Sequence, residues 1–328
     1  MLNDWLDAAL GGDETSVLSG NLPLGRYYSP APGILELIPT QPRPDAHACI
    51  ISAAIHGNET APVELVGELL AGLEAGTLSL GAPVLIILGN LTALVNNERF
   101  ITTNLNRLFK RGLEDVGEEP NRARELMAAV DTFYQSHVGF PALHYDLHTA
   151  IRESRYPRFV VEPFAETPTQ PEQWQWLAAA DIQAVLRQHQ PSWTFSHYSR
   201  HYHGAQSFTL ELGRVAPFGD NDLQSLQPFL GLLKALVKGE PPATAVPQSM
   251  AFFQVTHEIR RHSVDFQLCF SEAIPNFTAF PPGACLAWDS ATGEFRVEGA
   301  PLHVVFPNAR VALGERAALL ATSTTKVE

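Results

Sequence analysis

The sequence predicts an α/β protein: a mixed, mostly parallel central sheet covered by helices, followed by a small C-terminal β domain. From about residue 47, short apolar runs alternate with longer segments of helical period, a pattern typical of parallel sheets with crossover helices. The segment 238–249 contains three prolines and reads as a linker, and the chain beyond it has strand-like runs without a helix of normal length. We therefore predict a larger domain over residues 1–240, a linker at about 238–249 and a β domain over residues 250–328.

The elements of the larger domain follow from hydrophobic periodicity. Apolar residues recur at helical spacing from Val63 to Leu73, and Pro62 suits the first turn of that helix because its missing N–H has no partner there in any case. Further helices are expected around residues 123–134, 174–188 and 223–238. Buried strands are expected at residues 47–55, 83–89, 142–148, 158–162 and 207–213.

Composition limits the class of protein. The chain has 328 residues, 45% of them hydrophobic and 17% charged, which excludes a disordered or coiled-coil protein. A formal net charge of −13 argues against a nucleic-acid partner. The best apolar run is too short for a membrane span, and the first residues are acidic where a signal peptide would be basic. We expect a cytoplasmic protein without a membrane or nucleic-acid partner; its oligomeric state stays open.

The three cysteines, Cys49, Cys269 and Cys285, are few and odd in number, and they show no CxxC spacing. A disulfide framework or a cysteine-rich zinc site is therefore not indicated. We expect them to be small buried apolar residues.

The first motif with chemical content is IHGNETAP, in which His56 directly follows a predicted buried strand and Glu59 comes three residues later. Ligands of open α/β sheets collect at the carboxyl ends of strands, and a catalytic zinc takes three protein ligands. On these two residues alone, a solvated loop histidine and a glutamate that interacts with a helix N-terminus are the favoured interpretation.

Two further strands strengthen the metal interpretation. His148 ends the strand ALHYDLH, and Asp146 points to the same side by strand alternation, where a carboxylate can orient a metal-bound imidazole. Thr209 and Glu211 of SFTLELG face away from the apolar side of their strand. Glu211 is either a carboxylate on a half-exposed sheet face or the general base of a hydrolase. The pattern predicts a His56/Glu59/His148 zinc site with Asp146 behind it.

Four segments together, IHGNETAP, NERFITTNLNRLF, DLHTAIR and FTLELGRVAPFG, resemble the succinylglutamate desuccinylase and aspartoacylase family of the zinc carboxypeptidase clan, and the resemblance extends to LHVVFPNARVALGERAALL. The resemblance implies a zinc carboxypeptidase-like fold, one Zn²⁺ per chain held by His56, Glu59 and His148, and Glu211 as general acid and base. The implied reaction is zinc-dependent hydrolysis of the amide bond of N-succinylglutamate to succinate and glutamate, the last step of arginine catabolism by the succinyl pathway.

The resemblance also assigns the residues that meet a small anionic N-acyl amino acid. It implies that Arg99 polarises the scissile carbonyl and that Asn106 and Arg107 hold a substrate carboxylate, roles that suit a fixed cation and a planar guanidinium fork. Arg200 is a further candidate for carboxylate binding. Asn104 stands where the family usually has aspartate, and Leu91 where proline is common.

Two alternatives remain at this point. The first is another N-acyl amino acid deacylase, of the aspartoacylase kind, or a carboxypeptidase. The second is a non-catalytic binding protein on the same fold, which should have lost a ligand or the base; the sequence retains all of them.

Overall fold

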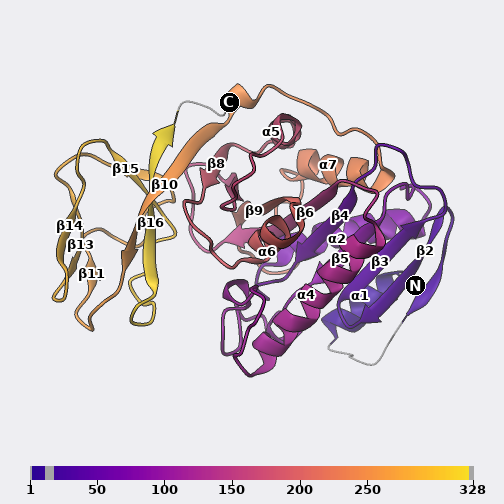
Figure 1. Ribbon diagram of the computed structural model, residues 1–328, viewed down its shortest axis with the longest axis horizontal. Helices are drawn as coiled ribbons and strands as arrows, with labels where there is room; N and C mark the ends of the chain where they lie inside the picture. The colour runs from indigo at the N-terminus through magenta and orange to yellow at the C-terminus, as the bar shows by residue number, and fades with distance from the viewer. Residues whose placement is uncertain (1, 12–17, 325–328) are drawn as a thin grey trace.

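The computed structural model describes residues 2–11 and 18–324. The ends of the two predicted domains, residue 1 and residues 325–328, lie outside the described part, as do residues 12–17. The described residues form a 13-stranded sheet in the order β1-β2-β3-β5-β4-β6-β9-β7-β8-β10-β16-β15-β12 and a three-stranded sheet β11-β13-β14. Figure 1 shows the helices gathered around the N-terminal part of the large sheet, while the C-terminal strands form a separate lobe.

The N-terminal part of the large sheet contains the strands that the apolar runs predict. They are β4 (Ala48–Ala53), β5 (Val84–Leu88), β6 (Ala142–Ala150), β7 (Arg158–Glu162), β8 (Ala184–Arg187) and β9 (Gln206–Arg214). Strands β5, β4, β6 and β9 are mutually parallel, and β7 and β8 are parallel to each other. Strand β7 runs antiparallel to β9, so the direction of the sheet reverses between them. The predicted mixed sheet with a largely parallel centre is thus confirmed.

The N-terminal edge was not anticipated from the sequence. Helix α1 (Leu2–Leu10) precedes three strands, β1 (Ser19–Leu22), β2 (Gly25–Ala31) and β3 (Ile34–Pro39), which extend the sheet in antiparallel fashion as far as β5. Burial alternates along β2, which leaves a weak apolar signal of the kind that a half-covered edge strand gives.

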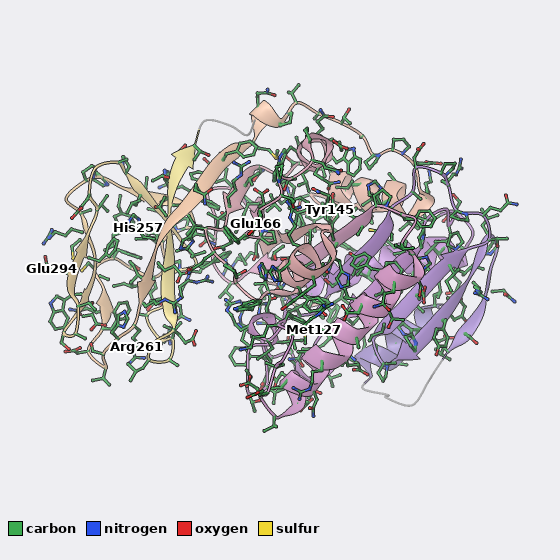
Figure 2. All side chains as sticks on the ribbon, in the orientation of Figure 1. Met127, Tyr145, Glu166, His257, Arg261 and Glu294 are labelled. Carbon is green, nitrogen blue, oxygen red and sulfur yellow. The ribbon has the colours of Figure 1, made fainter. Side chains whose placement is uncertain are left out.

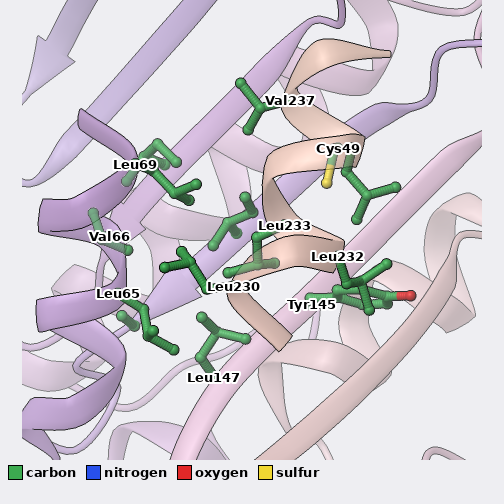
Figure 3. Close-up of a cluster of buried hydrophobic side chains, with 14 of the residues drawn as sticks. Cys49, Leu65, Val66, Leu69, Tyr145, Leu147, Leu230, Leu232, Leu233 and Val237 are labelled. Atoms are coloured by element: carbon green, nitrogen blue, oxygen red, sulfur yellow. The ribbon is translucent and has the colours of Figure 1, made fainter. Parts of the chain in front are cut away.

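Helices cover both faces of the sheet. One core contains side chains of α1, α2 (Thr60–Glu74), α5 (Pro171–Ala179) and α7 (Gln227–Lys238), and the other contains those of α4 (Glu118–Ser136) and α6 (Phe195–His203). Figure 3 shows the first core, where Leu65 and Leu69 of α2 lie near Leu230 and Leu233 of α7. Each fully buried leucine contributes roughly 1.5–3 kcal/mol, so these apolar stripes anchor α2 and the loop before it.

The remaining helical elements are short: α3 (Leu91–Val95), the 3-10 helix η1 (Leu105–Arg107) and the 3-10 helix η2 (Pro247–Ser249). The helix predicted over residues 174–188 is wrong in its second half. Helix α5 ends at Ala179, Asp181 has a φ of +62°, and the apolar residues that follow form β8. A short apolar run fits a buried strand as well as a helix, and the turn at Asp181 decides for the strand.

The C-terminal part is built from β10 (Ala251–Arg260), β11 (Gln267–Leu268), β12 (Thr278–Phe280), β13 (Cys285–Asp289), β14 (Gly293–Arg296), β15 (Leu302–Val305) and β16 (Arg316–Thr324). Figure 2 places His257, Arg261 and Glu294 on this lobe and Met127 and Tyr145 on the other. Strand β10 pairs in parallel with β8, so the large sheet continues from one lobe into the other. The boundary at residues 238–249 stays a prediction, although residues 240–246 have no regular structure.

The cysteines differ from expectation. Cys49 is buried in β4, as predicted, but Cys269 is exposed and Cys285 is half-buried. Among the described residues, no helix is long and apolar enough to cross a membrane.

Candidate functional site

The candidate site lies where three neighbouring parallel strands end. His56 follows β4, His148 lies near the end of β6, and Glu211 lies on β9 directly beside His148 in the β6–β9 register. Glu59 is the N-cap residue of α2, one short turn after His56. The strand order β4-β6-β9 therefore brings together side chains that are more than 150 residues apart in the sequence.

Gly57 makes the turn between His56 and Glu59 possible. A Cβ at this position would lie 2.1 Å from the carbonyl carbon of Ala93 and 2.2 Å from the amide nitrogen of Leu94. Because both atoms belong to the backbone of α3, a side chain there requires the helix or the turn to move. The close approach fixes the turn that carries the two ligand candidates.

His56, Glu59 and His148 form a compact buried cluster whose potential ligand atoms all lie within 4.8 Å of one another. Glu59 Oε1 is 2.8 Å from His56 Nδ1, and Glu59 Oε2 is 2.9 Å from His148 Nδ1. The backbone N–H of Thr149 donates to Glu59 Oε2 at 3.0 Å, which fixes the carboxylate. Two imidazole Nδ1 atoms and one carboxylate thus converge, a donor set that suits a zinc ion.

The charges of the cluster favour a positive charge between its carboxylates. Burial opposes ionisation of Glu59, yet His56 and His148 hold its pKa well below the ordinary value. Burial likewise opposes protonation of His148, but Asp146 and Glu59 raise its pKa well above the ordinary value. Burial and the Arg99 guanidinium lower the pKa of His56 to about 4. A proton on His148 therefore compensates the two buried carboxylates, and a bound cation could take its place.

Asp146 orients His148 from behind, as the alternation of the strand predicted. Its Oδ2 atom is 2.9 Å from His148 Nε2, which leaves Nδ1 facing Glu59. Ser52 donates to Asp146 Oδ1 at 2.6 Å and lies 2.8 Å from His144 Nε2, and His144 Nδ1 is 2.7 Å from the hydroxyl of Ser199. This supporting chain was missed, although period-two spacing puts His144 on the same face of β6 as Asp146 and His148.

Asn104 supports the other histidine. Its Oδ1 atom lies 3.1 Å from His56 Nε2 and accepts the backbone N–H of Asn106 at 3.0 Å. Although asparagine carries no charge, its side-chain oxygen contacts the imidazole of His56. His56 Nε2 therefore faces a neutral acceptor rather than a charged one.

Arg99 and Asn106 contact the cluster, whereas the Arg107 guanidinium donates to the carbonyl oxygen of Asn106 at 2.7 Å. Arg99 donates to Glu59 Oε1 at 2.8 Å, and Asn106 Nδ2 lies 3.5 Å from His148 Nε2. The backbone N–H of Phe195 donates to Asn106 Oδ1 at 2.9 Å, so the first residue of α6 holds this side chain in place. Loss of hydration, with the guanidinium groups of Arg316 and Arg99, lowers the pKa of Arg107 to about 9, although the residue is exposed. Arg107 therefore remains a cation at neutral pH.

The Glu211 side chain is a buried carboxyl group with little to stabilise its negative charge. It is 8% exposed, and its Oε2 atom is buried without a hydrogen-bond partner among the described residues. Burial raises its pKa to about 7, and the Glu59 carboxylate adds to the increase against the opposing effect of His148. A carboxyl group with a pKa near neutrality, aimed at a cluster of this kind, suits proton transfer in both directions.

Arg200 lies elsewhere, contrary to expectation. Its guanidinium donates to the carbonyl oxygen of Thr167 at 2.8 Å and to Thr169 Oγ1 at 3.2 Å, and it lines a cavity of about 500 Å³ that contains none of the cluster residues. Thr167 and Thr169 follow the carboxyl end of β7, and β7 runs antiparallel to β9. Arg200 also donates to the carbonyl oxygen of Ala205 at 3.4 Å, directly before β9, whereas Glu211 lies near the far end of that strand. The predicted contact between Arg200 and a substrate carboxylate at the cluster is therefore not supported.

Comparison with known proteins agrees with the fold. The model of the succinylglutamate desuccinylase/aspartoacylase catalytic domain matches residues 45–236, and that of the AstE/AspA barrel-sandwich hybrid domain matches residues 248–324. The chain therefore belongs to the succinylglutamate desuccinylase/aspartoacylase family.

Within that family, similar relatives and solved structures carry the name succinylglutamate desuccinylase. The chain is 39% identical to the succinylglutamate desuccinylase of Ectopseudomonas mendocina, over 97% of this chain and 96% of the relative. It is also 39% identical to that of Pseudoalteromonas atlantica, over 90% and 86%. The solved structure of succinylglutamate desuccinylase from Vibrio cholerae superimposes with a TM-score of 0.91 at 32% identity, covering 99% of this chain and 96% of that one.

Proposed function

We propose that this chain is a zinc-dependent amidohydrolase that cleaves N-succinylglutamate into succinate and glutamate. The observation that carries the proposal is the buried His56–Glu59–His148 cluster beside the uncompensated carboxyl of Glu211. The family membership and the names of the relatives support N-succinylglutamate as the substrate. The proposed setting is arginine catabolism in the cytoplasm.

The residues fit a single zinc ion. His56 and His148 would bind it through Nδ1, because the Nε2 atoms contact Asn104 and Asp146, and Glu59 would supply a carboxylate oxygen. Two imidazoles and one carboxylate leave a fourth position for water, which is the donor set of hydrolytic zinc sites. When bound, zinc lowers the pKa of a coordinated water towards about 7 and polarises the amide carbonyl.

The protein side chains would perform the proton transfers and hold the substrate. Glu211 accepts a proton from the attacking water as the new C–O bond forms, and it donates that proton to the glutamate nitrogen as the C–N bond breaks. Arg99 stabilises the negative charge that develops on the carbonyl oxygen. Asn106 and Arg107 bind a substrate carboxylate, for which the guanidinium fork of Arg107 has suitable geometry.

The experiment is hydrolysis of a panel of N-acyl amino acids by metal-stripped protein and by the same protein with zinc restored. The panel pairs succinyl, acetyl and formyl groups with glutamate and aspartate. We expect zinc to restore activity and N-succinylglutamate to give the highest kcat/KM. Preference for N-acetylaspartate would favour an aspartoacylase-like deacylase, and the absence of zinc-dependent turnover on every member would contradict the proposal.

A further inference from the structure

Two cysteines of the C-terminal part lie side by side. Cys269 directly follows β11, and Cys285 is the first residue of β13, its neighbour in the three-stranded sheet. The two Sγ atoms are 2.7 Å apart. A covalent S–S bond is about 2.05 Å long, so little movement separates this pair from a bonded one.

The backbone between the two cysteines is already paired. Gln267 lies opposite Trp288, Leu268 lies opposite Ala287, and the N–H of Cys269 donates to the carbonyl oxygen of Leu286 at 3.0 Å. This register puts Cys269 opposite Leu286 rather than Cys285. The β13–β14 pairing has a register shift between Cys285 and Ala287, and shifts of this kind bend a strand and re-aim its side chains.

We infer that Cys269 and Cys285, both free thiols in this structure, are oxidised under oxidising conditions to an intramolecular disulfide that closes the segment 270–284. The oxidant is a low-molecular-weight disulfide such as oxidised glutathione. One cysteine thiolate attacks it and forms a mixed disulfide, releasing one small thiol. The second cysteine thiolate then attacks the protein sulfur and releases the other, so two protein thiols are oxidised while one small disulfide is reduced to two thiols.

The segment that this bond closes contacts the loop that follows His148 and Thr149. Glu272 accepts from Arg152 at 2.8 Å, and Arg152 also donates to the carbonyl oxygen of Pro307 at 2.8 Å. Asn276 donates its N–H to the carbonyl oxygen of Glu153 at 2.8 Å and accepts the N–H of Arg155 at 3.1 Å. The disulfide therefore restrains the part of the C-terminal lobe that binds residues 152–155, whether or not the proposed hydrolysis is correct.

The exposure of Cys269 makes the pair accessible to a small oxidant. Partial burial of Cys269 and the neighbouring Cys285 thiol raise the pKa of Cys269 to about 11. Little of the Cys269 thiolate is therefore present at neutral pH. Exchange is therefore expected to be slow at neutral pH and faster as the pH rises.

The test is incubation of the full chain with oxidised glutathione at about pH 8.5, followed by peptide mapping without reduction. We expect a linked peptide pair that contains Cys269 and Cys285 and that disappears on reduction. Cys49→Ala, which removes the buried third cysteine, should give the same linkage, whereas Cys269→Ser and Cys285→Ser should each abolish it. Stable glutathione adducts on the wild type, or a dimer linked through Cys269, would overturn the inference.

Hydrogen exchange gives a second measurement on the wild type alone. Closing a loop of this length removes conformational freedom from the opened state, so amides in residues 270–284 should exchange roughly tenfold more slowly, or slower still, after oxidation. The amides of residues 152–155 should follow. Equal exchange in the oxidised and reduced proteins would mean that the bond does not restrain this contact.

Discussion

Replacing Glu211 with glutamine should change how the stability of the metal-free protein depends on pH. Burial raises the pKa of Glu211 in the folded protein to about 7, while an exposed glutamate in the unfolded chain has a pKa of about 4.3. The fold therefore binds this proton more tightly than the unfolded chain does. The stability that Glu211 contributes is fully present below about pH 4.3 and is lost as the pH rises through 7.

The expected magnitude follows from these two pKa values. Between about pH 5 and pH 8, ionisation of Glu211 should lower the free energy of unfolding by about 2.5 kcal/mol, since one pKa unit corresponds to about 1.36 kcal/mol. Glutamine has nearly the same shape and does not titrate. The free energy of unfolding of the Glu211→Gln variant should therefore fall by about 2.5 kcal/mol less than that of the wild type between about pH 5 and pH 8. This comparison holds even if the substitution changes the stability at every pH.

The assay is urea unfolding of the chelator-treated wild type and Glu211→Gln proteins at both pH values. The quantity of interest is the change in unfolding free energy between the two pH values, compared between the proteins, because titrating groups far from Glu211 contribute equally to both. The zinc-loaded variant should retain its metal and lose nearly all turnover. An identical pH dependence in both proteins would refute the raised pKa, and near-normal kcat would refute the role of Glu211 in proton transfer.

Three further substitutions test the remaining parts of the site. Glu59→Gln removes the negative charge that lies between the two imidazoles. Zinc affinity should therefore fall by more than roughly tenfold in a chelator competition. Unchanged affinity would exclude Glu59 as a ligand. Arg99→Ala should lower kcat roughly 10²–10³-fold while zinc content stays constant by elemental analysis, and a loss of only a few-fold would remove Arg99 from the chemical step. Gly57→Ala should destabilise the protein by about 1–3 kcal/mol or more in urea unfolding, because the added Cβ meets the backbone of Ala93 and Leu94. Gly139→Ala, where a Cβ meets nothing within 4 Å, is the matched control, and equal effects of the two changes would contradict the packing argument.

The strands that carry the site were predictable because each is a buried apolar run with a polar residue at its end. Residues 48–53, 142–150 and 206–214 are of this kind, and strand alternation also gave the common side of Asp146 and His148. The antiparallel edge β1–β3 was not predictable in the same way, because an alternating edge strand lacks a continuous apolar run.

Arg200 shows what sequence proximity cannot give. It lies eleven residues before Glu211, yet α6 and β9 run in opposite directions along the sheet, and the threonines that Arg200 contacts follow β7 rather than β9. Arg200 contacts the carbonyl oxygen of Ala205 at the start of β9 and the loop that follows β7, and local sequence pattern does not encode the packing of α6 that sets these contacts. The contact between Cys269 and Cys285 likewise depends on a strand register and a bulge that no spacing rule anticipates.

A net charge of −13 does not prevent binding of the proposed trianionic substrate. The net charge is spread over the surface, whereas substrate binding depends on the charges inside the site. At physiological ionic strength, exposed charges are screened beyond about 8 Å, so most surface carboxylates have little effect inside the site. There, the guanidinium groups of Arg99 and Arg316 are close enough to lower the pKa of Arg107. That repulsion among cations would be relieved by an anionic ligand, whereas Glu59 and Asp146 already share the protonated His148 that lies between them. The local field therefore favours a small anion even though the surface as a whole does not.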